Sequence, residues 1–332
     1  MSKAKVAVIG TGGTITSIGK SPLDLFEYTA TGKMLEADEL VAKFAEVREV
    51  AEIIPVRFKA VPSTAVAFPE WKQLVLEADK AVAAHPDLAG IVILHGTATL
   101  EETAYALNLT AKVPVPIVVV GSQRPASALS TDAGLNLVNA VRTAASPAAR
   151  GLGVLVCLND EIQCAREVTK TSTARLQTFR SPDFGVLGHA DGDAVNFYRK
   201  PIRKGAPDTE FDIRSLAVLP RVDIAYSYAG DDGTAVRAFA AAGAKGIVAA
   251  AFAPGMLSPP ETEAYKAAND AGVVVVMSSR AGSGRVFNSS KIRDAGFLTA
   301  DNLTPQKARI LLALALTKTK EPAEIRRMFA TY

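Results

Sequence analysis

The chain alternates between short, almost continuously apolar runs and longer segments with helical periodicity. Five runs rich in Val and Ile lie in the first half, at residues 6–9, 52–56, 90–94, 116–120 and 153–158. Strands that are buried on both faces of a parallel sheet have this composition. Helical spacing of apolar residues is found between them, over residues 36–44, 69–84, 100–109 and 132–145. The alternation predicts an α/β fold with helices on both faces of a mostly parallel sheet.

Residues 199–220 interrupt this rhythm. Pro201, Pro207 and Pro220 lie there among charged residues, a composition typical of a connection between domains. The alternation then resumes, with strands expected at residues 222–228, 246–252 and 272–277 and helices that begin near Pro305 and Pro322. We therefore predict an N-terminal α/β catalytic domain over residues 1–200, a linker over 201–220 and a smaller C-terminal α/β domain over 221–332.

Composition narrows the class of protein. Hydrophobic residues make up 48% of the 332 residues, enough for a substantial core, and the net charge is only +3 with scattered basic residues. A nucleic-acid partner is not expected, because it would need a clustered basic face. No apolar run approaches the ~20 residues of a membrane helix, and no secretory leader is visible at the start. We expect a cytoplasmic protein with no membrane partner.

Cysteine and histidine usage predicts neither a disulfide framework nor a metal centre. Cys157 and Cys164 are the two cysteines, and we expect both to be reduced and buried. The three histidines lie far apart in the sequence, which argues against a histidine-based metal site. No cofactor is expected.

The first strand ends in an unusual glycine-threonine loop, Gly-Thr-Gly-Gly-Thr-Ile-Thr over residues 10–16. Ligands of open α/β sheets gather at the carboxyl ends of the strands, so this loop is a candidate site. Two alternatives are a plain structural turn and a dinucleotide-binding loop. The second would need glycine in place of Ile15 and an acidic residue about 20 positions later, and both are missing.

Two further loops carry chemistry after predicted strands. The third strand is followed by hydroxyls at Thr97 and Thr99 and by acids at Glu101 and Glu102, which we expect to complement a helix dipole. His95, in the same loop, is expected to be a core histidine. After the fifth strand Lys170 lies between two threonines, which makes it a candidate for an amine with a perturbed pKa.

Five ordered motifs resemble the asparaginase/glutaminase family over essentially the whole chain. They are TGGTI, GIVILHGTATLEETAYAL, VVVGSQRPASALSTDAGLNL, LNDEIQCAREVTKTST and LTPQKARILLALALTKT. The resemblance implies a two-domain asparaginase-like fold and hydrolysis of a small-molecule amide. It also implies a homo-oligomer, a dimer of dimers, with active sites between paired subunits.

The resemblance assigns roles to individual residues. The second threonine of TGGT, here Thr14, matches the family's nucleophile, and Tyr28 matches the tyrosine of the mobile loop that covers the site. Ser63 matches a serine that binds the substrate carboxylate, with Thr64 beside it. These residues are accordingly expected to meet in one site.

Two further expected site residues come from the second and the fourth of the five motifs. Thr97 matches the first threonine of the family's HGTDT motif, and Lys170 matches the lysine of VTKT; we predict that they form a proton relay. Gly13, Gly96 and Ala98 are expected to line the substrate site, and the backbone N–H groups of Gly13 and Ala98 are candidate oxyanion donors.

Three departures from the family pattern bear on the substrate. Ala98 replaces the aspartate that holds the substrate's α-ammonium in the family. The segment after Ser279 has no acid before Asp294, so it lacks a match for the second ammonium-binding carboxylate, and residues 253–256 replace an asparagine-containing loop. These losses predict an amide without a free α-amine, such as a monoamide or a cyclic amide.

Three other hypotheses stay open at this point. The chain is a genuine L-asparaginase with a rewired ammonium site, a catalytically weak homologue that binds a small ligand, or the asparaginase-like subunit of a glutamyl-tRNA amidotransferase. The last would carry an additional N-terminal domain and a basic tRNA-binding face. Ammonia release from a panel of amides separates the enzymatic hypotheses from the binding one.

Overall fold

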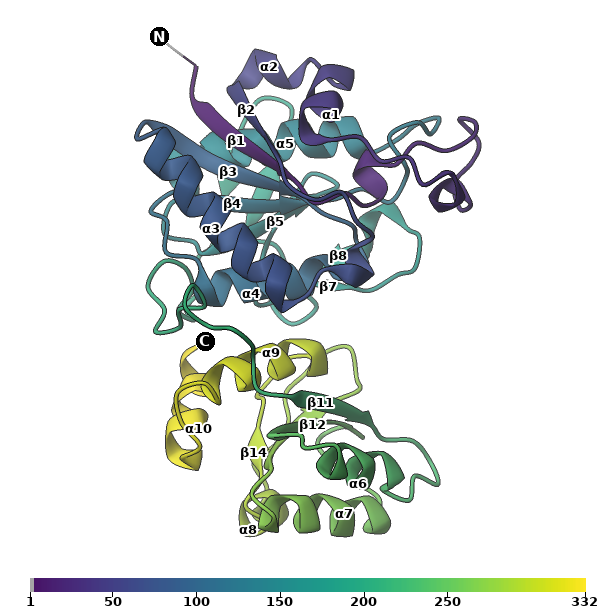
Figure 1. Cartoon of the computed structure of the whole chain (residues 1–332), viewed down its shortest axis with the longest axis vertical. Coiled ribbons are helices and arrows are strands. Elements are labelled where there is room, and N and C mark those ends of the chain that lie inside the picture. The colour runs from purple at the N-terminus through teal and green to yellow at the C-terminus, as the bar shows by residue number, and fades with distance from the viewer. Residues whose placement is uncertain (1–2) are drawn as a thin grey trace. The chain divides into compact units, whose positions relative to one another are not determined.

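A computed structural model describes residues 3–332, which form two compact units, one up to Arg214 and one from Ser215 (Figure 1). The first unit is built on an eight-stranded sheet with strand order β10-β9-β6-β5-β4-β3-β1-β2. Five of these strands are parallel: β1 (Lys5–Gly10), β2 (Glu52–Arg57), β3 (Leu88–Leu94), β4 (Ile117–Val120) and β5 (Val154–Leu158). They match the predicted apolar runs within two residues.

Helices cover both faces of this sheet. Alternate strand residues, among them Val6, Val92 and Leu155, share one buried cluster with the helices α1 (Ala37–Lys43), α2 (Val47–Val50) and α5 (Ala133–Ala145). The other face carries α3 (Phe68–Ala84) and α4 (Leu100–Thr110) (Figure 1). Because both faces are covered, strand residues on each side are buried, which explains their continuous hydrophobicity. The predicted α/β class is confirmed.

One edge of the sheet was not predicted from the apolar pattern. The strands β6 (Glu161–Cys164), β9 (Gly188–Ala190) and β10 (Val195–Phe197) extend it in antiparallel fashion, and β7 (Thr169–Lys170) pairs with β8 (Phe179–Arg180) beside it. These strands have two to four residues and include polar side chains. Their pairing therefore depends on neighbouring strands rather than on a hydrophobic pattern.

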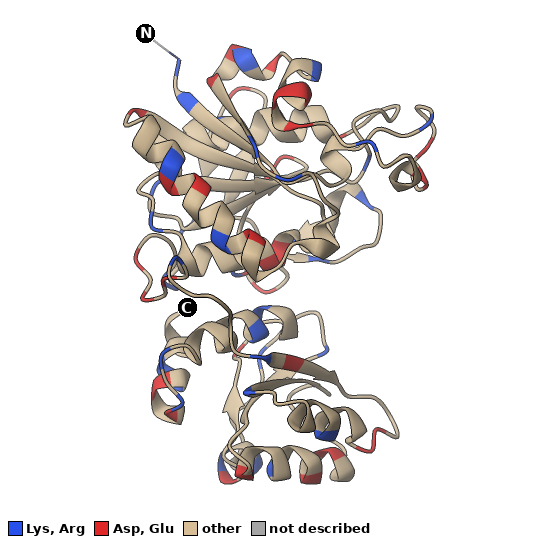
Figure 2. Cartoon of the chain, viewed as in Figure 1, with Lys and Arg blue, Asp and Glu red and all other residues tan. Residues whose placement is uncertain are grey.

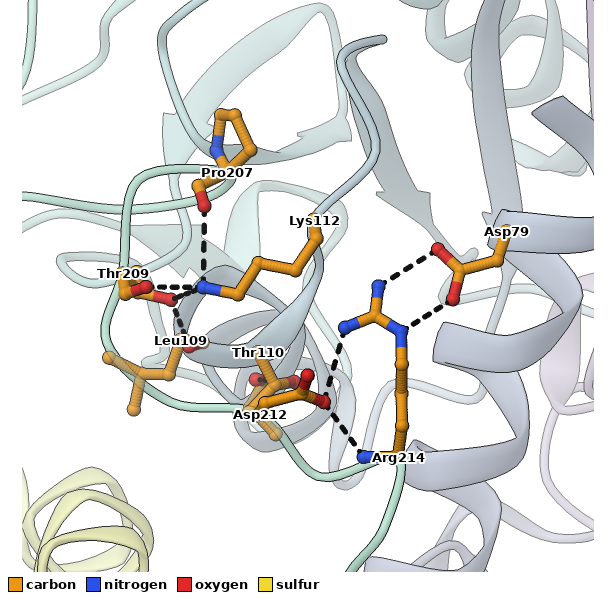
Figure 3. Close-up of polar contacts among 9 residues, drawn as sticks. Asp79, Leu109, Thr110, Lys112, Pro207, Thr209, Asp212 and Arg214 are labelled. Atoms are coloured by element: carbon orange, nitrogen blue, oxygen red, sulfur yellow. Dashed lines mark hydrogen bonds and ion pairs between the residues drawn. The ribbon is translucent and has the colours of Figure 1, made fainter. Parts of the chain in front are cut away.

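The segment that follows β10 is fastened to the first unit (Figure 3). The ammonium of Lys112 donates to Pro207 O at 3.3 Å and to Thr209 Oγ1 at 2.7 Å. Arg214 forms a bidentate ion pair with Asp79 of α3, with N···O distances of 2.7 and 2.9 Å. The boundary between the compact units thus falls after these anchors, inside the stretch that the sequence assigns to the linker.

The second unit has a parallel four-stranded sheet in the order β11-β12-β13-β14. Its strands are β11 (Val222–Tyr226), β12 (Gly246–Ala251), β13 (Val274–Ser279) and β14 (Leu298–Thr299), and its helices are α6 (Thr234–Ala241), α7 (Pro259–Asp270), α8 (Ser290–Asp294), α9 (Pro305–Ala315) and α10 (Pro322–Thr331). Pro305 and Pro322 open their helices, as predicted. Within residues 3–332 no helix is both long and apolar enough to cross a bilayer.

Charges are mixed in sign over the surface. Figure 2 shows basic and acidic residues interspersed along α3, where Lys80 and Glu77 form an ion pair at 2.9 Å. Both cysteines are free and buried, Cys157 in β5 and Cys164 in β6. Their thiols are therefore shielded from oxidants.

Candidate active site

The loop after β1 uses its three threonines in different ways. Thr11 Oγ1 donates to Leu94 O at 2.8 Å, and Thr16 Oγ1 donates to Gly13 O at 3.0 Å. Both hydroxyls are buried and serve the backbone. Thr14 begins a short 3₁₀ turn, is only partly buried and directs its hydroxyl to another side chain. Thr14 is therefore the threonine of this loop that is available for chemistry.

Gly13 is where two loops touch. It has a φ of +89°, and a Cβ added to it would lie 2.2 Å from the Cα of Gly96, in the loop after β3. Only glycine fits such a contact without strain. The pair brings the carboxyl ends of β1 and β3 together, so Thr14 and Thr97 come to lie around one cavity, 83 residues apart in sequence.

Tyr28 reaches Thr14 from a loop that is closed at its base. Residues 16–18 pair with residues 33–35, through Ile18 N to Lys33 O at 2.9 Å and Leu35 N to Thr16 O at 2.8 Å. The loop between them carries Tyr28, whose hydroxyl lies 2.9 Å from Thr14 Oγ1. This hydrogen bond, in which either oxygen can be the donor, orients the hydroxyl of Thr14.

Lys170 approaches the same site from β7. Its Nζ donates to Thr97 Oγ1 at 2.8 Å. Burial lowers the pKa of Lys170 from its usual value of 10.5, and the negative charge of Glu101 partly opposes this effect. A lysine with a lowered pKa has a larger neutral fraction near pH 7, which is what a general base needs.

Ser63 is placed by another 3₁₀ turn, Ser63–Ala65, that follows β2. Its carbonyl accepts a hydrogen bond from Thr99 Oγ1 at 2.7 Å, which ties this turn to the loop after β3. Ser63 is buried at the base of the site, whereas Thr64 is exposed. The hydroxyl of Ser63 lies directly against Gly96, since a Cβ added to that glycine would be 2.8 Å from Ser63 Oγ.

A cavity of about 450 Å³ joins these groups. All nine residues expected from the sequence line it: Gly13, Thr14, Tyr28, Ser63, Thr64, Gly96, Thr97, Ala98 and Lys170. Sequence reasoning missed six further lining residues: Ser17, Thr29, Gly32, Lys33, Met34 and Pro62. Most of them lie on the same loop as Tyr28, so their closeness to Tyr28 in the sequence could have predicted them. The lining contains two lysines and, within the described chain, no aspartate or glutamate.

One polar residue near the cavity, His95, belongs to the core. His95 is fully buried, its Nδ1 lies 2.8 Å from Gly96 O, and burial lowers its pKa to about 4. It is therefore neutral at physiological pH, as expected for a core histidine. Residues 3–332 hold no cluster of three or more His, Cys, Asp or Glu side chains that could bind a metal ion.

Two family models match this chain. The asparaginase N-terminal domain matches residues 5–203, and the glutaminase/asparaginase C-terminal domain matches residues 221–329. The chain belongs to the asparaginase/glutaminase family. It is accordingly an amidohydrolase that acts on C–N bonds, and the resemblance drawn from the five motifs is confirmed.

Individual members of the asparaginase/glutaminase family match along nearly the full chain. L-asparaginase 2 of Bacillus subtilis (strain 168) is 40% identical, over 98% of this chain and 86% of that protein. Glutaminase-asparaginase of Pseudomonas fluorescens biotype A is also 40% identical, over 99% and 91%. The crystal structure of a probable cytoplasmic L-asparaginase from Campylobacter jejuni has a TM-score of 0.94 and 39% identity, and the match covers 99% of this chain and 100% of that one.

In the second unit of this asparaginase-family chain, Arg280 ends the Ser-Ser-Arg sequence after which the family resemblance implies a carboxylate. Arg280 directly follows β13, and its guanidinium lies 4.5 Å from the ring centroid of Phe252 and 5.8 Å from that of Tyr226. Its Nη1 donates to Ser227 O at 2.8 Å. The carboxyl edge of this smaller sheet is thus aromatic and positively charged around Arg280.

Proposed function

We propose that this chain hydrolyses an amide that has no free α-amino group, with Thr14 as the nucleophile. The observation that carries the proposal is the cavity itself. It holds the Thr14–Tyr28 and Lys170–Thr97 hydrogen bonds together with two lysines, and no carboxylate of residues 3–332 lines it. The lining thus offers no counter-charge for an ammonium, and an amide without an ammonium fits it better.

The proposed reaction has two stages. Thr14 Oγ attacks the amide carbon, and the proton it loses passes through Thr97 to the neutral amine of Lys170. The C–N bond breaks as the nitrogen is protonated, and ammonia leaves an acyl ester on Thr14. Water then attacks this ester by the same relay and releases the carboxylic acid. Backbone N–H groups of Gly13 and Ala98 are the proposed oxyanion donors.

The substrate class follows from position 98. Ala98 is exposed to the cavity and carries no charge. A substrate ammonium placed there would be desolvated without a counter-charge, which costs several kcal/mol, or roughly two or more decades in selectivity. Ser63 is retained at the base of the cavity, which supports a substrate that is an acid. A dicarboxylic monoamide meets both conditions, and a cyclic amide meets the first.

L-Asparagine hydrolysis is the second candidate, and the names of the relatives favour it. Proteins named L-asparaginase 2 and glutaminase-asparaginase are 37–40% identical to this chain. If the chain hydrolyses L-asparagine, another group must bind the substrate's α-ammonium in place of the carboxylate that is missing at Ala98.

The assembly is proposed to be a homo-oligomer, a dimer of dimers. Four large apolar side chains at the carboxyl edge of the second sheet are more than half exposed: Tyr226, Tyr228, Met256 and Phe287. Clustered exposed apolar residues of this kind mark protein interfaces. We also propose a cytoplasmic location, which the free cysteines and the probable cytoplasmic L-asparaginase of similar structure support; one relative is instead named as periplasmic.

Ammonia release from matched amides tests the substrate class. We expect kcat/KM for succinamate, which is asparagine without its α-amine, to exceed that for L-asparagine by at least ~10²-fold. Ala98→Asp should move this ratio toward asparagine, because it returns one carboxylate to the cavity. If the wild type prefers L-asparagine with ordinary efficiency, the argument from the missing carboxylate is wrong and the second candidate stands.

A further inference from the structure

Two adjacent glutamates in the first turn of α4 have different surroundings. Glu101 is only 6% exposed, whereas Glu102 is half-buried on the same turn. The sequence treats both as helix-dipole complements, and that explanation does not require either carboxylate to be buried. A buried carboxylate needs a partner that compensates for its lost hydration.

Glu101 contacts the strand that carries the proposed base. The backbone N–H of Lys170 donates to Glu101 Oε1 at 3.3 Å, while Lys170 Nζ donates to Thr97 Oγ1 at 2.8 Å. Thr97 and Glu101 are four residues apart, in the loop and first turn that follow β3. One short segment therefore holds Lys170 at both ends, its main chain through Glu101 and its amine through Thr97.

The same carboxylate provides charge opposite the amine. The charge that acts on the Lys170 amine comes from Glu101 of α4, and Tyr28 and Lys33 of the covering loop line the same cavity as Lys170. Lys33 is exposed. Arg180 of β8 pairs with Thr169, so its side chain lies on the opposite face of β7 from that of Lys170. Of these groups, Glu101 is the anion.

We infer that Glu101 is a positioning residue of this site, whose carboxylate fixes β7 beside Thr97 and supplies the negative charge opposite Lys170 that Ala98 cannot supply. The inference rests on the proposed role of Lys170 as the general base. It explains how a member of the family keeps its lysine in place with alanine at position 98.

The pH dependence of kcat/KM on the best amide tests the charge of Glu101. Glu101→Gln keeps an oxygen that accepts from Lys170 N–H but removes the negative charge. Because an opposite charge favours the protonated amine, its loss lowers the pKa of Lys170, and the ascending limb should move to lower pH by roughly 0.5 unit or more. Glu102→Gln, one residue along the same turn, is the matched control and should leave the limb unchanged. If the ascending limb of the kcat/KM profile of Glu101→Gln lies at the same pH as in the wild type, the inference is overturned.

A second pair of variants tests position and charge separately. Glu101→Asp keeps the charge but withdraws the carboxylate by one methylene, so kcat should fall several-fold while the limb moves little. Adding Ala98→Asp to Glu101→Gln should return the limb toward the wild-type pH, because it restores a carboxylate next to Thr97. Wild-type kcat in Glu101→Asp would contradict the positioning role, and this measurement remains decisive if Glu101→Gln does not fold.

Lys170→Met separates a failure of this inference from a failure of the proposed function. If Lys170→Met retains wild-type kcat, the lysine is not the base and the proposed mechanism fails. If Lys170→Met is inactive and Glu101→Gln leaves the limb in place, only the role of Glu101 fails.

Discussion

Replacing Lys170 by methionine should inactivate the enzyme without destabilising it. Methionine keeps most of the side-chain length and removes the amine that donates to Thr97 Oγ1 at 2.8 Å. Removal of a general base lowers kcat by about 10² to 10⁴. We expect a loss in this range with little change in KM, because the proposed relay acts on the proton of Thr14 and not on substrate binding.

The stability of the same variant has a defined pH dependence. Burial lowers the pKa of Lys170 below 10.5, so the charged amine is less favourable in the folded chain than in the unfolded one. Between the folded pKa and 10.5 the unfolded chain binds more protons, and wild-type stability rises with pH through this window. Lys170→Met has no amine, so it does not carry the cost of burying a charged amine below this window. It should be at least as stable as wild type at pH 7, and the difference should vanish above about pH 10.5.

Coupled ammonia release and urea unfolding at several pH values measure both effects. Lys200→Met, at an exposed position outside the cavity, is the control for removing one positive charge. A change in KM alone would make Lys170 a binding residue, and a wild-type profile without an ascending limb would remove the reason for assigning it as the base. Loss of stability at pH 7 would refute the argument from burial.

Three further results are expected. Thr14→Ala should abolish turnover while circular dichroism and oligomer size stay unchanged, and more than a few per cent of wild-type kcat would rule out Thr14 as the nucleophile. Sedimentation should show a dimer of dimers, so a stable, active monomer would contradict the proposed assembly. His95→Gln should reduce the loss of stability at acid pH. The pKa of His95 is about 4 in the folded chain against the usual 6.5, so the unfolded chain binds its proton first and the free energy of unfolding falls by about 3 kcal/mol as the pH drops through this window. Unfolding curves of equal pH dependence would show that His95 does not contribute.

The sequence by itself determined the parallel part of the first sheet and the loops that carry Thr14, Ser63 and Thr97. Runs such as residues 90–94 and 116–120 are apolar at every position, and their short length and their Val and Ile content are typical of strands covered on both faces. Because parallel strands end at the same edge, the loops that carry Thr14, Ser63 and Thr97 had to meet there. The motif resemblance then selected among the hydroxyls, and every residue it selected lines the cavity.

Only the tertiary structure decided what each polar group does. Thr11 and Thr14 are the same residue type in the same loop. The hydroxyl of Thr11 donates to the carbonyl of Leu94, whereas that of Thr14 contacts the hydroxyl of Tyr28 and stays available for chemistry. Glu101 and Glu102 are indistinguishable as residue types, yet the helix turns one toward Lys170, which lies 69 residues further along the chain. Hydrogen bonding and burial depend on which atoms lie within about 3 Å of each other. Local patterns fix the elements, and packing between distant elements fixes those distances.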